Sequence, residues 1–244
     1  MLSRVAERVF WMARYLERAE STARIANTFS QIRMDLPRGS ELPWQTLLEI
    51  FGADGNFDDL KRSASEHSVL NFMLARVGNP NSIRFSVTAA RENARTAREV
   101  LPEEVWELVN ELHLFTKEFA EKSVARRNRF DFLMQIVTRC QALSGLMMTT
   151  QTRDHAYRFI TFGHLVERLD LNARVILAVS AAIDSREGAN PAFDGLVPCS
   201  LAVLNPLKSP SLAFKSTSYI PLPVLSTISM NGVASSLGFA FNLM

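Results

Sequence analysis

Two stretches of the chain, YLERAESTAR at residues 15–24 and LVERLDLNAR at residues 165–174, share the pattern E-R-x-[ED]-x-x-A-R at an offset of 150 residues. The flanking residues also match in character, since Phe10 aligns with Ile160. Similarity at a fixed offset indicates equivalent structural elements. Each stretch lies in a run whose apolar residues recur three and four positions apart, which is typical of one face of a helix. The sequence therefore predicts two pseudo-equivalent long helices.

Acidic residues of these helices are expected among apolar side chains. Because each residue advances about 100° around a helix axis, Glu20 and Asp170 fall within apolar stripes. The stripes expected to face the core are Val5, Val9, Met12, Leu16, Ala19 and Ala23 in the first helix, and Phe159, Phe162, Val166, Leu169, Ala173 and Leu177 in the last. A carboxylate placed there needs a cationic partner, because its desolvation is costly.

Arginines one turn further along each helix supply such partners. Arg24 follows Glu20 and Arg174 follows Asp170 at i,i+4, with the acid on the favourable N-terminal side. If the two helices pack together, we also expect each acid to reach the other helix's arginine. A structural role, in which the charges set helix register, is the interpretation we favour over a binding role. The predicted charge cluster is Glu17, Arg18, Glu20, Arg24, Glu167, Arg168, Asp170 and Arg174.

Helical periodicity covers most of the chain before residue 184. Clusters of Gly and Pro, and a basic patch from Arg126 to Arg129, are expected to separate the helices. Ser82 and Thr152 are predicted N-caps. The expected helices are 3–34, 43–51, 65–76, 82–100, 103–122, 130–148 and 153–183. Since no segment alternates like a β-strand, the prediction is an all-α, up-and-down bundle of six or seven helices.

Residues 191–244 differ in composition from the helical domain predicted over residues 1–190. The whole chain carries 27 basic and 25 acidic residues, but from residue 195 onward there are two lysines, no acid and five of the ten prolines. A reading-frame shift, which we favour, would explain this irregular composition. The alternatives are a genuinely different tail or a disordered one. Its prolines and serines argue against a membrane anchor over residues 216–244.

The composition also argues against several function classes. Balanced charge gives no reason to expect binding to nucleic acid or to a membrane. Cys140 and Cys199 form no CxxC pair, so neither a disulfide framework nor a thiolate metal site is indicated, and a cytoplasmic location fits best. The N-terminus lacks the features of a secretory signal. We expect Cys140 to be a core residue.

Cofactor chemistry has little support in the sequence. No P-loop or GxSxG elbow is present, which argues against ATP handling and serine hydrolysis in this chain. His164 and Glu167 form an HxxE pair, but a di-metal site in a helical bundle needs further carboxylates. We therefore expect no metal and no cofactor, and no catalytic residue can be assigned.

The segment TAARENARTARE at residues 88–99 repeats an Ala-Arg dipeptide among alternating charges. Such alternation is typical of a solvated or groove-lining helix face. Arg91, Arg95 and Arg98 are the candidates for a partner surface.

Three separated blocks of the chain carry a family resemblance. They are MLSRVAERVFWMARYLERAESTARI at 1–25, NPNSIRFSVTAARENARTARE at 79–99 with VWELVNELH at 105–113, and YRFITFGHLVERLDLNAR at 157–174. In this order they resemble the bacterial alpha-E family, a predicted α-helical domain with an ER motif, from Met1 to about Ala182. Family members continue with charged helical sequence, and this chain departs from that pattern after about Asn190.

The resemblance implies which genes are neighbours of this one, and it does not imply a particular reaction. Alpha-E genes stand beside circularly permuted ATP-grasp proteins of the carboxylate-amine ligase type and beside transglutaminase-like proteases. We therefore expect a non-catalytic interaction component of a bacterial peptide-modification system, with those two proteins as partners. The alternative is an enzyme whose substrate or metal site is lined by the acids and arginines of the charge cluster.

Overall fold

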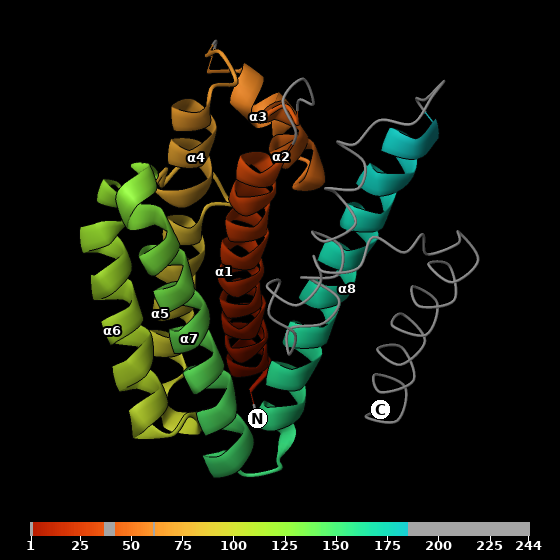
Figure 1. Cartoon of the computed structure of the whole chain (residues 1–244). Helices are drawn as coiled ribbons and strands as arrows, with labels where there is room; N and C mark the ends of the chain where they lie inside the picture. The colour runs from red at the N-terminus through yellow and green to blue at the C-terminus, as the bar shows by residue number, and fades with distance from the viewer. Residues whose placement is uncertain (1, 37–41, 61, 185–244) are drawn as a thin grey trace.

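All regular structure is helical in the part of the chain that the computed structural model describes, residues 2–36, 42–60 and 62–184 (Figure 1). This agrees with the predicted fold class. The long helices are α1 (Ser3–Asp35), α5 (Ile83–Thr96), α6 (Glu103–Phe119), α7 (Arg126–Thr150) and α8 (His155–Asp184). The shorter ones are α2 (Gln45–Ile50), α3 (Asp54–Asp58), α4 (Glu66–Leu74) and the 3-10 turns η1 (Arg98–Val100) and η2 (Lys122–Val124).

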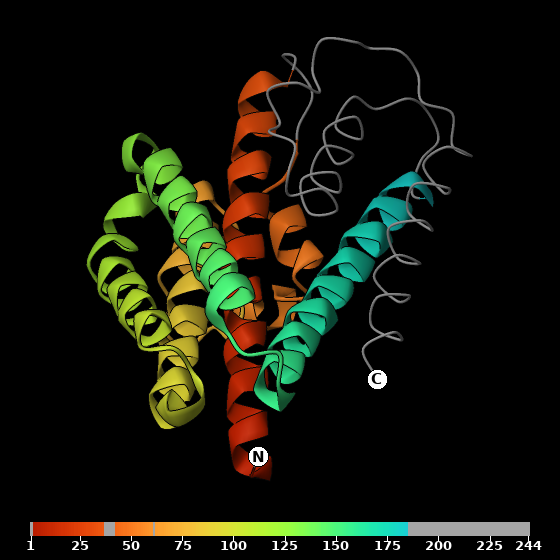
Figure 2. The same ribbon diagram turned by 90° about the horizontal axis from the view of Figure 1, so that it is seen from below.

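Helix α1 is the central element of the fold. It packs against α5, α7 and α8, while α6 closes the bundle by packing against α5 and α7. Neighbouring helices from α5 to α8 alternate in direction, so that α8 runs the same way as α1 (Figure 1). The two diverge toward their C-terminal ends, where α2 contacts α8 and lies between them (Figure 2).

The core explains why α1 lies at the centre. All six residues of its predicted apolar stripe are buried, including Val9, Met12 and Ala19, which are fully inaccessible. Phe29, on another side of the helix, is also fully buried. A helix that is buried on several sides must be surrounded by other helices. The prediction for this stripe is confirmed.

Two predicted helix breaks need correction, and one predicted cap is confirmed. The short helix α3 begins at Asp54, between Gly52 and Gly55, where glycines were expected to separate helices, and the basic patch at Arg126 begins α7 instead of separating two helices. Arg126 and Arg129 both bind Glu66, the first residue of α4, which explains why this patch can be helical. Ser82 accepts the predicted cap hydrogen bond from Phe85.

The cap of α8 was predicted at the wrong residue. Asp154, not Thr152, accepts a hydrogen bond from a first-turn amide, that of Tyr157 at 3.1 Å. Both residues are suitable N-caps by type. The helix begins later than predicted, at His155, and the carboxylate next to that start is therefore the one within reach.

Candidate functional site

The carboxylate of Glu17, on α1, contacts two side chains of α8, those of Arg168 and His164. Its two carboxylate oxygens accept hydrogen bonds from Nε and Nη2 of Arg168 at 2.8 and 3.0 Å. Nδ1 of His164 lies 3.2 Å from the same carboxylate. A guanidinium group that donates two parallel bonds fixes both distance and orientation.

Glu167 of α8 makes the reciprocal set of bonds to α1. Nε and Nη2 of Arg18 donate to its two oxygens at 2.5 and 3.1 Å, and Nε of Arg14 donates at 2.7 Å. Each helix thus contributes one acid and two donors. The corresponding members, 150 residues apart in number, are Arg14 and His164, Glu17 and Glu167, and Arg18 and Arg168. We call these six residues the Glu-Arg lock.

The Glu-Arg lock is a buried ionic cluster. Glu17 is 4% exposed and Glu167 is 1% exposed. Burial acts to raise the pKa of Glu17, but the hydrogen bond from His164 and the charge and hydrogen bond of Arg168 outweigh it and lower that pKa to about 2. The pKa of Arg168 is raised, because the charge of Glu17 outweighs the opposing effect of burial. Both groups are therefore held in their charged forms.

Helices α1 and α8 come close enough for these bonds because of Gly163. A Cβ atom at this residue would lie 2.5 Å from the carbonyl oxygen of Phe10 and 3.1 Å from Cβ of Ala13. Only a residue without a side chain permits backbones to approach so closely. Glu167 follows Gly163 by four residues and Glu17 follows Ala13 by four, so the two glutamates lie one turn beyond this contact.

The predicted charge cluster is confirmed within each helix and corrected between helices. Arg24 pairs with Glu20 at 2.6 Å and Arg174 pairs with Asp170 at 3.0 Å, both at i,i+4 as expected. The expected cross-helix contact of Glu20 with Arg174 is wrong, since Arg174 instead donates to the carbonyl oxygen of Phe51. At this level α1 and α8 have diverged, and the Asp170–Arg174 pair is half exposed.

The sequence analysis missed Arg14 and His164. Their signal is the 150-residue offset itself, because each lies three residues before the glutamate of its Glu-Arg dipeptide. Residues three or four apart share a helix face, so a donor there can join the arginine in binding a carboxylate on the neighbouring helix.

Glu20 lies next to the lock and has a different electrostatic environment. Burial and the nearby charge of Glu17 raise its pKa, against the hydrogen bond from Arg24. The thiol of Cys140, on α7, is buried at the same level of the bundle, as expected for a core residue. Burial, together with the charges of Glu20 and Glu17, holds the pKa of this thiol well above its usual range.

The apolar stripe of α8 faces outward, which corrects the prediction. Phe159, Phe162 and Leu177 are 40%, 37% and 68% exposed. The adjacent face, which carries Gly163 and Glu167, packs on α1 instead. Ile160, Leu171 and Val175 of α8 are also buried, so the close approach and the ionic contacts act together with apolar packing to fix which face of α8 points inward.

A row of exposed and half-buried residues on α8 has the spacing of a coiled-coil seam. Phe159, Phe162, Val166, Leu169, Ala173 and Ile176 follow one another at alternating intervals of three and four, and we call them the α8 seam. This spacing is typical of helices that pack against another helix. At its start, Phe162 packs against Phe10 with ring centroids 5.7 Å apart. A groove of about 560 Å³ opens there, lined by Ser3, Ala6, Glu7, Phe10, His155, Phe159 and Phe162.

The arginines of the candidate partner surface, Arg91, Arg95 and Arg98 on α5 and η1, make local contacts. Arg91 donates to Asn110 and to Glu92, and Arg95 also donates to Glu92. The guanidinium carbon of Arg98 lies 4.9 Å from the ring centroid of Trp106. Each of these three arginines thus contacts a neighbouring residue of its own chain.

The remaining sequence-based expectations concern metals and the tail. Among the described residues no three His, Cys, Asp or Glu side chains form a group that could hold a metal ion. His164 faces Glu17 and not its HxxE partner Glu167. No described helix has an apolar run long enough to cross a lipid bilayer. Cys199 and the tail at 191–244 lie outside the described residues.

An all-helical domain in which two Glu-Arg dipeptides bind each other across parallel helices is the class that this fold and site define. The chain belongs to the Alpha-E family, described as a predicted alpha-helical domain with a conserved ER motif, whose model matches residues 1–204. The match extends beyond Ala182, where the resemblance was expected to end. No curated protein and no solved structure matches the chain.

Proposed function

We propose that this chain is a non-catalytic helical module that binds a partner protein through the α8 seam, and that the Glu-Arg lock holds the seam in position. In this proposal α1 and α8 act as an equivalent pair, as their matching dipeptides suggest. The observation that carries the proposal is the outward-facing heptad spacing of α8. Apolar residues at such intervals favour a helix as the bound element.

The charges near the seam favour an acidic partner helix. The first turns of α1 carry Arg4, Glu7 and Arg8, and the first turn of α8 carries Arg158, all of them exposed. None of these four side chains makes an ion pair with another described residue. Their sum is positive, so an apolar helix flanked by Asp or Glu would complement this end of the seam.

The Glu-Arg lock itself supports a structural role over a catalytic one. Both oxygens of Glu17 and both oxygens of Glu167 accept arginine N–H groups. A general acid or base needs a pKa near the working pH, whereas the pKa of Glu17 is lowered to about 2. A saturated, buried pair of this kind sets the position of one helix on another.

The partners that we propose are those implied by the family resemblance, a circularly permuted ATP-grasp protein and a transglutaminase-like protease. The chain would then contribute binding and positioning to peptide modification, while the partner supplies the chemistry. An enzyme with a site at the charge cluster is the alternative.

The test is binding of the purified ATP-grasp protein and the purified protease from the same genome to the full chain, measured by biolayer interferometry. Phe159→Asp and Phe162→Asp, at seam residues that are 40% and 37% exposed, should each weaken binding by about tenfold or more, because anchor residues that become buried dominate helix recognition. Matched controls are Met134→Asp and Leu114→Asp, which replace side chains that are 40% and 56% exposed on other helices.

Three results would count against the proposal. Unchanged affinity of both seam variants would remove the seam as the binding surface. Equal losses of affinity in the control variants would show that a new negative charge weakens binding wherever it is placed. A change from dimer to monomer in the seam variants alone, measured by light scattering, would identify a second copy of the chain as the occupant.

A further inference from the structure

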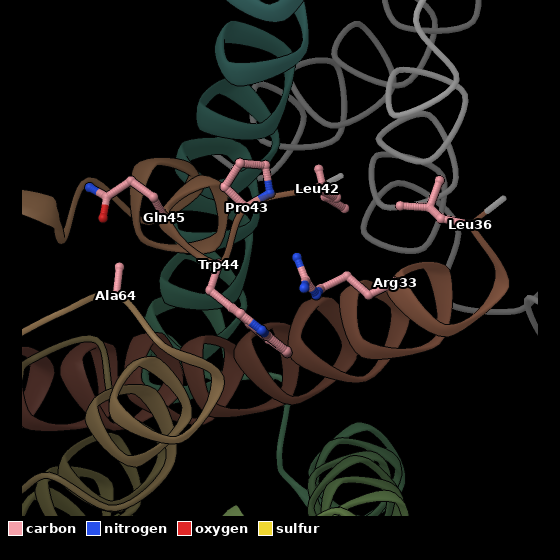
Figure 3. A pocket seen from close by; sticks show the side chains of 7 residues that line it. All are labelled: Arg33, Leu36, Leu42, Pro43, Trp44, Gln45 and Ala64. Carbon is pink, nitrogen blue, oxygen red and sulfur yellow. The ribbon is translucent and has the colours of Figure 1, made fainter. Parts of the chain in front are cut away.

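A second feature of the molecule lies at the C-terminal end of α1, away from the lock and the seam. There Arg33 projects toward an open pocket beside the start of α2 (Figure 3). Its guanidinium carbon lies 4.8 Å from the ring centroid of Trp44. This distance is within the range of a cation–π contact.

The indole ring of Trp44 is a fixed platform. The side chain is buried, and its ring packs against that of Phe29 with centroids 5.3 Å apart. Phe29 belongs to the core of α1. The guanidinium group of Arg33 is therefore held against a rigid surface, which reduces the entropy that a ligand would have to remove from it.

Arg33 differs from the other arginines of α1 that stack on aromatic rings. Arg14 and Arg18 also stack, on Trp11 and Tyr15, but both donate to Glu167. Arg33 makes no hydrogen bond or ion pair with any residue in the described parts of the chain. A guanidinium group has five N–H donors, and those of Arg33 remain available on the pocket side.

Apart from Arg33 and Gln45, the described residues that line the pocket are of apolar or aromatic type. Its volume is about 340 Å³, which is within the range of small-molecule sites. The described residues that line it are Arg33, Leu36, Leu42, Pro43, Trp44, Gln45 and Ala64, and Arg33 is the one ionisable side chain among them. Figure 3 shows the guanidinium group directed toward the side of the pocket that Leu42 and Pro43 form.

We propose that this pocket binds a carboxylate that is attached to an apolar group, with Arg33 holding the carboxylate and Leu36, Leu42 and Pro43 contacting the apolar part. The planar fork of arginine matches a carboxylate through two parallel hydrogen bonds. A single positive charge among apolar walls favours a monoanion over a more highly charged group. The C-terminal residue of a peptide and a small free organic acid both have this chemistry. The site is separate from the α8 seam, and so the inference does not depend on the proposed function.

The experiment is isothermal titration calorimetry of the full chain with three probes: acetyl-Ala-Ala-Leu, its C-terminal amide, and N-acetyl-leucine. Acetyl-Ala-Ala-Leu should bind, and its amide should bind about tenfold more weakly or worse, because it lacks the charge that Arg33 recognises. N-acetyl-leucine binding as tightly as the peptide would identify a free acid as sufficient. Weaker binding of N-acetyl-leucine would identify a peptide end. Either result supports the site.

Variants of Arg33 test whether this side chain binds the carboxylate. Arg33→Met should lower the affinity for acetyl-Ala-Ala-Leu about tenfold or more, and Arg33→Lys should lower it less, since it retains the charge without the fork. Arg98→Met is the matched control, because Arg98 stacks on Trp106 at 4.9 Å in the same way. The affinity of the Arg98→Met variant for acetyl-Ala-Ala-Leu should equal that of the unaltered chain. Circular dichroism verifies that all three variants are folded.

Several outcomes would overturn the inference. No heat of binding with either acid, or equal binding of the acid and the amide, would exclude a carboxylate site. Equal losses in the Arg33 and Arg98 variants would exclude this pocket. Competition by inorganic phosphate at the same concentration as the peptide would show an unselective anion site.

Discussion

Gly163 of α8 lies against the carbonyl oxygen of Phe10 in α1, so closely that a Cβ atom at residue 163 would lie 2.5 Å from that oxygen. The obstacle is backbone, which cannot rotate away as a side chain can. A larger residue here would move α8 outward. The reciprocal bonds of Glu17 and Glu167 would then lengthen together.

Gly163→Ala should therefore destabilise the fold, although alanine is the better helix former. We expect a loss of about 1–3 kcal/mol in the free energy of unfolding, the usual cost of overpacking. Urea denaturation followed by circular dichroism measures it. Gly145→Ala, in α7, is the control because a Cβ there meets nothing within 4 Å, and it should stabilise by about 0.5–1 kcal/mol. Two variants of equal stability would contradict the close approach.

The lock should show strong energetic coupling between its two helices. A double-mutant cycle of Glu17→Gln and Arg168→Met should give a coupling free energy of about 1–3 kcal/mol, because the pair is close and bidentate and its carboxylate is buried. The cycle of Asp170→Asn and Arg174→Met is matched to it. That pair is half exposed on both sides, so its coupling should stay below about 0.5 kcal/mol. Equal couplings in the two cycles would show that the lock adds nothing beyond a surface pair.

Glu17 should also make stability depend on pH. Its pKa is lowered from 4.5 to about 2 in the folded chain, so its contribution is fully present above the unfolded value and disappears as pH falls through the folded one. The shift corresponds to about 3 kcal/mol. The unaltered chain should therefore be more stable than Glu17→Gln near neutral pH, and the difference should shrink as pH falls from about 4.5 toward 2. Unfolding by urea at a series of pH values measures it.

The lowered pKa of Glu66 does not affect this comparison. Its pKa is also lowered to about 2, chiefly by the hydrogen bond from Arg126, but it is present in both proteins and cancels from the comparison. Glu111→Gln, at an exposed and distant pair with Arg139, should follow the unaltered chain at every pH. A difference between the unaltered chain and Glu17→Gln that is constant across the range would argue against a lowered pKa at Glu17.

The sequence predicted contacts within one helix better than contacts between helices. Periodicity located the long helices, the buried stripe of α1, and the pairs of Glu20 with Arg24 and Asp170 with Arg174. These features depend on residues within one helix. The bonds of Glu17 to Arg168 and of Glu167 to Arg18 depend on how two helices cross, and helical geometry within one helix does not predict that crossing.

The orientation of α8 could not be read from its apolar pattern. A helical projection directs the most apolar face to the core, and for α8 that face contains Phe159 and Leu177. In the structure the face toward α1 instead contains Gly163, His164 and Glu167, which complement particular groups of α1. Complementarity of this kind is a property of the pair of helices. The sequence of either helix alone does not indicate this complementarity. Its one indication is the constant offset in residue number between matching residues of the two helices.

Cys140 should report on opening of the bundle at the level of the lock. The thiol is 2% exposed, and its pKa is raised well above the usual range by burial and by Glu20 and Glu17. In a Cys199→Ser background, Ellman's reagent at mildly alkaline pH should therefore label Cys140 no faster than the chain opens, since the thiolate is the reactive species. Addition of denaturant should make labelling immediate. Glu17→Gln should accelerate labelling of the folded chain and Glu111→Gln should not, because only the former weakens the contact between α1 and α8 and removes a charge that raises the pKa of the thiol. Rapid labelling of the folded, unaltered chain would show that the thiol is not buried where α7 packs on α1.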